Sequence, residues 1–79
     1  MKKPPKLPFQ SPDEIRAFRE KCQMNQTEFW TRVGVTQSAG SRYESGRSIA
    51  RPVQTMLAIA YGTPAQSAKA VEYLRSWRD

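Results

Sequence analysis

The sequence contains no histidine and only one cysteine, Cys22. A zinc finger needs several Cys and His ligands, and a Ser-His or Cys-His catalytic site needs an imidazole base, so the composition excludes both. A single cysteine cannot form a disulfide within the chain, which is typical of proteins from a reducing compartment. We expect Cys22 to be a small buried hydrophobic residue on a helix.

Other signals of enzyme chemistry are also missing. The seven Asp and Glu residues are scattered, no pair of them is placed for acid and base catalysis, and there is no glycine-rich phosphate loop. A chain of 79 residues is also too short to enclose a large substrate cavity as well as a core. The sequence therefore predicts one small domain that is not an enzyme and that uses no cofactor and no metal.

Long apolar segments are absent as well. No run approaches the roughly 20 residues of a membrane-spanning helix, and no apolar stretch follows the charged N-terminus as in a signal peptide. We therefore expect a cytoplasmic protein without membrane contact. What the chain has in excess is positive charge, since 13 Lys and Arg give a formal net charge of +6. Such a charge is typical of polyanion binders, although it can serve solubility alone.

The first ten residues differ in composition from the rest, because residues 1–10 hold three lysines and three prolines. This composition predicts a flexible basic arm, which would either follow the backbone or a groove of a nucleic acid or act only as a solubilising tail. Leu7 and Phe9 are the residues of this arm that could fold back onto the remaining domain, residues 11–79.

Helical signals divide that domain into five segments, and no strand-like alternation is present, so the predicted fold class is all-α. A Ser-Pro-Asp-Glu sequence at residues 11–14 marks the first start. The predicted helices are residues 12–23, 26–33, 37–45, 52–61 and 64–77. The short turn around Gly34, between the second and third helices, predicts a helix-turn-helix.

Residues 25–38, NQTEFWTRVGVTQS, and residues 41–47, SRYESGR, resemble the phage repressor/Cro-type helix-turn-helix family, also called the XRE family. The resemblance covers roughly residues 14–60. It rests on the glutamine that opens the second helix, the Gly-Val-Thr turn and the Tyr-Glu-Ser-Gly-Arg ending. It implies a five-helix, lambda-repressor-like DNA-binding domain whose third helix lies in the major groove.

The resemblance assigns DNA contacts to particular side chains. Those implied to read bases are Gln37, Ser38, Ser41 and Arg42. Those implied to contact phosphates are Asn25, Gln26, Arg47, Ser48 and Arg51. Glutamine can pair with adenine and arginine with guanine through two hydrogen bonds each, whereas phosphate contacts only position the protein. The alternatives are an ordinary solvated face for the third helix and a helix-capping role for Asn25.

Two further pairs concern the structure of the domain. The resemblance implies that Arg19 and Glu44 bond to each other, which would keep this carboxylate away from the DNA. Trp30 and Gly40 depart from the family pattern, which has alanine and a branched aliphatic residue at these two facing positions. We expect the indole of Trp30 to fill the space left at Gly40. The alternative is that Gly40 lets DNA approach closely.

The last predicted helix carries an apolar stripe of Ala68, Val71, Leu74 and Trp77. Either it packs back on the first helix, or Leu74 and Trp77 form the dimer contact that the resemblance implies. The sequence thus predicts a sequence-specific regulator of transcription, a repressor that occupies a palindromic operator as a homodimer. The alternative is an antitoxin or accessory regulator whose C-terminal helix binds a partner protein.

Overall fold

Five α-helices and a closing 3₁₀ turn make up most of residues 3–78, the part of the chain that the computed structural model describes. The elements are α1 (Pro12–Lys21), α2 (Gln26–Thr31), α3 (Gln37–Glu44), α4 (Arg51–Tyr61), α5 (Pro64–Arg75) and η1 (Ser76–Arg78). No strand occurs within these residues. The prediction of an all-α, five-helix fold is therefore confirmed.

Polar N-cap residues fix the starts of four of the helices. In each case a side-chain oxygen accepts the backbone N–H three residues ahead, which satisfies one of the donors left unpaired at a helix start. The four caps are Ser11, Asn25, Thr36 and Thr63. These local interactions explain why the predicted and observed starts agree to within one residue.

Cys22 is exposed, which corrects the expectation that it is buried. Helix α1 ends at Lys21, two residues earlier than predicted, because Cys22 is its C-cap and Gln23 adopts a φ of 57°. A residue in this left-handed region cannot continue an α-helix. The thiol therefore lies beyond the buried stripe of α1, on which Ile15 is fully buried.

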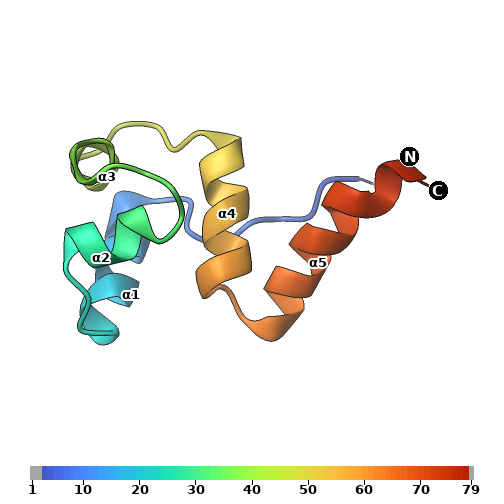
Figure 1. Ribbon diagram of the computed structural model, residues 1–79, viewed down its shortest axis with the longest axis horizontal. Coiled ribbons are helices and arrows are strands. Elements are labelled where there is room, and N and C mark those ends of the chain that lie inside the picture. The colour runs from blue at the N-terminus through green and yellow to red at the C-terminus, as the bar shows by residue number, and fades with distance from the viewer. Residues whose placement is uncertain (1–2, 79) are drawn as a thin grey trace.

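Helices α1, α2 and α3 pack together at one end of the molecule, α4 lies beside them, and α5 runs outward from the end of α4 (Figure 1). The main core at the first end consists of Phe9, Ile15, Phe29, Trp30, Val33 and Leu57. A smaller cluster of Leu7, Ala58 and Ala70 lies between α4 and α5. Helix α4 joins the two, since its adjacent residues Leu57 and Ala58 belong to different clusters.

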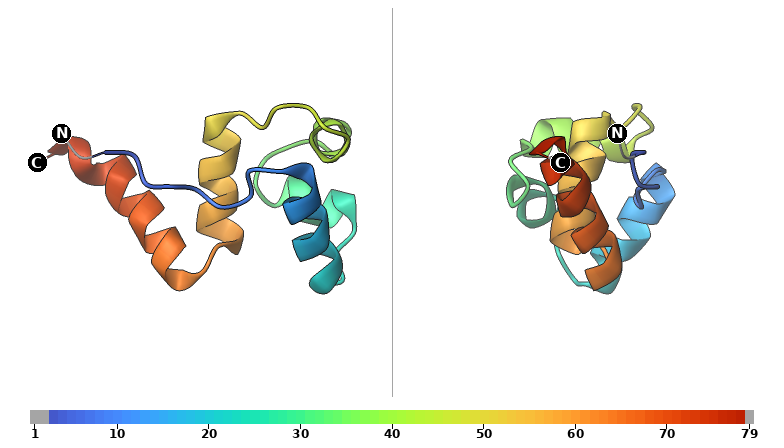
Figure 2. Two further views of the ribbon diagram at one scale, coloured as in Figure 1. Left: turned by 180° about the vertical axis from the view of Figure 1, so that it is seen from behind. Right: turned by 90° about the vertical axis from the view of Figure 1, so that its right-hand side faces the viewer.

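The predicted arm is docked on the domain over residues 3–10, which we call the strap. It contains neither helix nor strand and runs from α1 past α4 toward the end of α5 (Figures 1 and 2). Leu7 and Phe9 are each only 4% exposed, and the backbone N–H of Phe9 donates to Glu14 Oε2 over 2.8 Å. The strap thus differs from a free arm, because two apolar side chains spaced by two residues both enter the cores. The arm's first two residues, like Asp79 at the domain's end, lie outside the described part.

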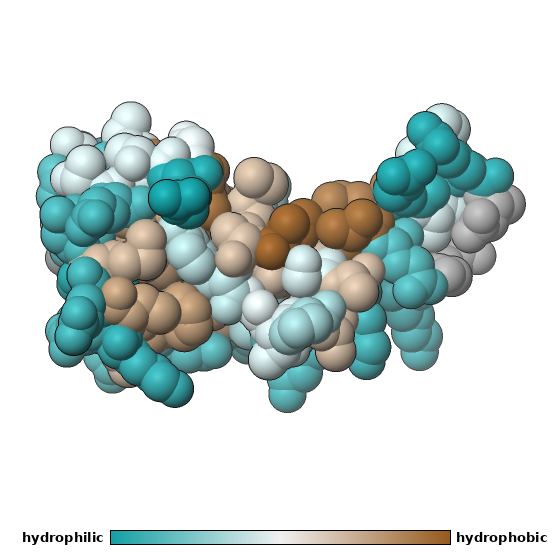
Figure 3. Space-filling view, turned by 60° about the horizontal axis from the view of Figure 1, so that its bottom comes forward, coloured by the Kyte–Doolittle hydropathy of each residue, from teal (hydrophilic) through white to brown (hydrophobic). Residues whose placement is uncertain are grey.

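Helix α5 packs on α4 and not on α1, and it does so beside its apolar stripe. Ala70 is the buried residue, at 1% exposure, whereas Leu74 is 52% and Trp77 78% exposed. The hydroxyl of Ser67 also donates to the backbone carbonyl of Ile59 in α4, over 3.1 Å. Because small side chains line the contact with α4, the larger apolar side chains of α5 remain on the surface. Figure 3 shows hydrophobic residues gathered over the region of α4 and α5, between hydrophilic ends.

Candidate nucleic-acid interface

The turn between α2 and α3 is fixed by backbone hydrogen bonds and one glycine. The N–H groups of Val33 and Val35 both donate to the carbonyl of Trp30, over 3.2 and 3.0 Å. Gly34 adopts a φ of 79°, a conformation that side-chain-bearing residues rarely take. The chain then reverses sharply into α3, whose start is capped by Thr36. This turn sets the direction in which α3 projects its side chains.

The four side chains implied to read bases lie together on α3. Gln37, Ser38 and Arg42 are exposed and Ser41 is partly buried. The Nε2 of Gln37 donates to Oε1 of Gln26 over 2.9 Å, so the structure also brings a candidate base contact and a candidate phosphate contact together. This bond restrains the amide of Gln37 at the N-terminal end of α3.

The residues implied to contact phosphate are more dispersed. Asn25 caps α2, since its Oδ1 accepts the N–H of Glu28 over 2.8 Å and Glu28 returns the bond. Arg47 and Ser48 are exposed in the loop after α3, and the guanidinium of Arg47 lies over the Tyr43 ring, 5.9 Å from its centroid. Arg51 points elsewhere, because its Nη2 donates to the carbonyl of Pro5 in the strap over 2.9 Å. The structure does not bring Arg51 together with the other candidates.

The Arg19–Glu44 pair is part of a larger arrangement, which we call the Glu44 cluster. The carboxylate of Glu44 is 3% exposed and accepts two bonds from Arg19, at Nε (3.0 Å) and Nη2 (2.8 Å). It also accepts a bond of 2.7 Å from Nε1 of Trp30. The Nη2 of Arg16 donates to the backbone carbonyl of Glu44 over 2.6 Å. The cluster thus ties α1 and α2 to the last residue of α3.

Arg16 and the indole N–H of Trp30 were missed by the sequence reasoning. Arg16 lies three residues before Arg19, on the same face of α1, and this spacing was a usable signal. The N–H of Trp30 carried no such signal, since its contact depends on how α2 and α3 cross.

Opposing effects act on the ionisation of Glu44. Burial raises the pKa of its carboxyl, but hydrogen bonds from Arg19, Trp30 and Gln26 and the charge of Arg19 together hold the pKa below the ordinary value of 4.5. The hydrogen bond between Arg19 and Glu44 also raises the pKa of Arg19, although burial of the guanidinium lowers it. Both groups are therefore charged at neutral pH, and the negative charge of α3 is neutralised inside the domain.

Trp30 and Gly40 are in direct contact, and both are buried. A Cβ built on Gly40 would lie 2.2 Å from Cγ of the indole and 2.3 Å from Cδ1, distances that no side chain can occupy. Gly40 therefore faces the indole and not the solvent. This arrangement offers no support for the alternative in which Gly40 admits a close approach of DNA.

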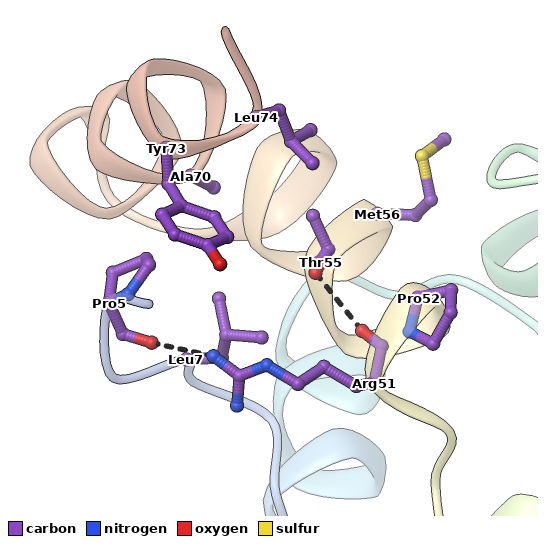
Figure 4. A pocket seen from close by; sticks show the side chains of 9 residues that line it. All are labelled: Pro5, Leu7, Arg51, Pro52, Thr55, Met56, Ala70, Tyr73 and Leu74. Carbon is purple, nitrogen blue, oxygen red and sulfur yellow. Dashed lines mark hydrogen bonds between the residues drawn. The ribbon is translucent and has the colours of Figure 1, made fainter. Parts of the chain in front are cut away.

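A second surface feature, the α4–α5 groove, lies away from α3. It has a volume of about 520 Å³ and is lined by Pro5, Leu7, Arg51, Pro52, Thr55, Met56, Ala70, Tyr73 and Leu74. The strap forms one wall, and Tyr73 points into the space between the strap and α4 (Figure 4). The lining is mostly apolar, so the groove suits an apolar side chain better than a charged ligand.

Residues 3–78 contain neither a metal-binding cluster nor a membrane-spanning helix. No group of three or more Cys, Asp or Glu residues there could hold a metal ion. No helix in the same part of the chain is long and apolar enough to cross a membrane.

Comparison with known proteins identifies the family. Residues 16–60 match the model described as the RsaL-like helix-turn-helix domain. No curated protein and no solved structure gave a significant match. The matched residues include α2, α3, most of α4 and all the candidate DNA contacts. Helix-turn-helix domains are the DNA-binding parts of transcription regulators. The match spans more than half of the 79 residues, so the chain belongs to the RsaL-like helix-turn-helix domain family.

Proposed function

We propose that this protein is a repressor that binds a specific double-stranded DNA operator through α3 and acts by occupying it, in the cytoplasm. One observation carries the proposal. The only acidic residue of α3, Glu44, is buried against Arg19, so the exposed face of the helix presents only neutral and positive groups. Glutamine, serine and arginine on that face match the donors and acceptors of base edges in the major groove.

The proposed division of roles follows from side-chain chemistry. Arg42 would bond guanine, Gln37 would bond adenine, and Ser38 and Ser41 would bond either base. Gln26, Asn25, Arg47 and Ser48 would contact phosphates on both sides of α3. Arg51 would have to break its hydrogen bond to the Pro5 carbonyl before it could contact a phosphate, so we expect it to contribute less to binding than the other four residues. This docking follows the mode of the Cro-type XRE family, which we propose as the closest functional analogy.

We also propose that two copies pair through α5, with Leu74 and Trp77 in the contact. The support is that both side chains are exposed and that Leu74 lines the α4–α5 groove. A two-fold dimer of this kind would read an operator with inverted half-sites.

Selection of bound fragments from random duplex DNA tests the proposal. We expect a motif of two inverted half-sites about one helical turn apart. The affinity of the protein for this motif should fall roughly a thousandfold between about 50 and 200 mM salt if the protein contacts about six phosphates. Failure to enrich any motif would overturn sequence-specific binding.

The oligomeric state of the purified chain separates this proposal from its alternative, an antitoxin or accessory regulator. A wild-type dimer that Leu74→Ser converts to monomer supports the repressor. A monomeric chain whose operator affinity is unaffected by Leu74→Ser would favour the alternative, in which the exposed groove holds a different protein.

A further inference from the structure

Trp30 contacts α3 at Gly40 and Glu44, which lie one helical turn apart, and its ring also packs against Tyr43 of the same helix. Its ring covers Gly40, where three indole atoms lie 2.2 to 2.6 Å from the place a Cβ would take. Its Nε1 donates to the carboxylate of Glu44 over 2.7 Å. Residues 40 and 44 are four apart, so both contacts fall on the same face of α3.

These two contacts do different things. The thickness of the ring sets how closely the backbone of α3 approaches α2 at Gly40, because no side chain intervenes. The N–H fixes the position of the Glu44 side chain at the other end of the face. Two fixed points on one face restrain both the distance of α3 from the core and its rotation about its own axis.

The position of Trp30 is itself well restrained. The side chain is fully buried, and its ring makes an edge contact with Phe29 at 5.2 Å between centroids. Glu44 is held from α1 as well, by both Arg19 and Arg16. The indole is therefore a rigid spacer between fixed parts of the domain and α3.

We infer that Trp30 is a positioning residue for base recognition, acting through Gly40 and Glu44 without touching DNA. The inference rests on the proposed reading of bases by α3. Arg42 lies between the two contact points in sequence and on the opposite, exposed side of the helix. Hydrogen-bonded recognition tolerates errors of only about 0.5 Å and 10–20°. A small rotation of α3 should therefore weaken base contacts and leave phosphate contacts almost unchanged.

The test compares two ways to remove the N–H with one control. Trp30→Phe keeps an aromatic ring, and a synthetic chain with benzothienylalanine at position 30 keeps the bicyclic shape but has no N–H. The control is Tyr61→Phe, which removes a partly buried hydrogen bond from the Tyr61 hydroxyl to the Phe29 carbonyl (2.7 Å) and changes no contact with α3. Each chain is titrated with the selected operator duplex and with a scrambled duplex of equal length, at a temperature where circular dichroism shows it folded.

We expect the ratio of the two affinities to fall roughly tenfold for both position-30 variants, the size of a weakened bidentate base contact. Affinity for the scrambled duplex should stay within about twofold, since phosphate contacts dominate it. Tyr61→Phe should leave the ratio unchanged. An unchanged ratio in the benzothienylalanine chain would overturn the inference alone. A wild-type chain that binds both duplexes equally would overturn the proposed function, and the inference with it.

Discussion

At one end of the molecule, α3 lies on a fully buried indole and a bonded ion pair, while at the other end α5 leaves α4 with its larger apolar side chains uncovered. At the first end, polar and aromatic contacts hold α1, α2 and α3 in one fixed arrangement relative to each other. The second is held by small residues and by the strap, and it includes an open groove. The contacts at the α3 end are thus buried within the single chain, whereas the α5 end leaves large apolar side chains exposed.

The largest expected effect comes from breaking the packing at the α3 end with Gly40→Val. Its side chain would overlap the indole of Trp30, and we expect a loss of at least about 3 kcal/mol in the free energy of unfolding. Urea unfolding followed by circular dichroism measures it. The double change Trp30→Ala with Gly40→Val should recover much of this loss, and additive damage would reject the volume exchange.

Removing the carboxylate of the Glu44 cluster is expected to cost slightly less. Glu44→Ala leaves the partly buried guanidinium of Arg19, 14% exposed, without its carboxylate, for which we expect a loss of about 3 kcal/mol. A thermal melt that this change leaves unaltered would contradict the pairing.

The same carboxylate gives the α3 end a dependence on pH. Because the folded-state pKa of Glu44 lies below its ordinary value of 4.5, ionised Glu44 contributes stability that is fully present above pH 4.5. This contribution is lost as the pH falls through the lower, folded-state pKa. The free energy of unfolding of Glu44→Gln should therefore depend less steeply on pH over that range than the free energy of unfolding of the wild type. Parallel pH dependences of the two proteins would contradict a stabilising role for the ionised carboxylate.

The strap offers a way to weaken the α5 end. Leu7→Ala removes a side chain that packs against Ala58 and Ala70, and we expect a loss of about 2–3 kcal/mol. Lys6→Ala, at the exposed neighbouring position, serves as the matched control and should lie within about 0.5 kcal/mol of the wild type. Equal stability of the two variants in urea would mean that the strap is not part of the fold.

Arg42→Ala should change DNA binding at the α3 end without changing the stability of the fold. We expect it to reduce operator affinity by about 1–3 kcal/mol and to relax the preference at one base position. Arg47→Ala should weaken binding to all sequences similarly. The thermal melt of Arg42→Ala should match that of the wild type, and an unrelaxed base preference would remove Arg42 from the base-reading set.

The smallest effect on the single chain is expected for Leu74→Ser. An exposed side chain on α5 contributes little to folding, so the free energy of unfolding measured at low concentration should change by less than about 0.5 kcal/mol. Sedimentation at higher concentration should nevertheless show loss of the dimer. Strong destabilisation of the monomer would mean that the α5 surface belongs to the fold.

The sequence could predict those features that depend on neighbours in the chain. The caps at Ser11, Asn25, Thr36 and Thr63 each act over three residues, so the helix starts were readable. The contact of Trp30 with Gly40 could be inferred because an unusually large residue faces an unusually small one.

The remaining features depend on how the helices cross. The bond from Arg51 to Pro5 joins residues 46 apart, and that from Arg16 to Glu44 joins residues 28 apart. The apolar stripe of the last helix left open whether Leu74 and Trp77 are buried or exposed, and only the close approach of α5 to α4 selects Ala70 as the buried residue. No periodicity in one helix contains that information.

The two tryptophans of the chain lie one at each end, and their surroundings differ as much as the ends do. Trp30 is fully buried beside a carboxylate, while Trp77 is 78% exposed with the guanidinium of Arg78 over its ring. Their fluorescence should therefore separate into a blue-shifted component that acrylamide cannot quench and a red-shifted one that it quenches readily. The fluorescence of Trp30 would thus report a change in the packing of α3, and that of Trp77 would report any molecule that binds beside the end of α5, with no added label.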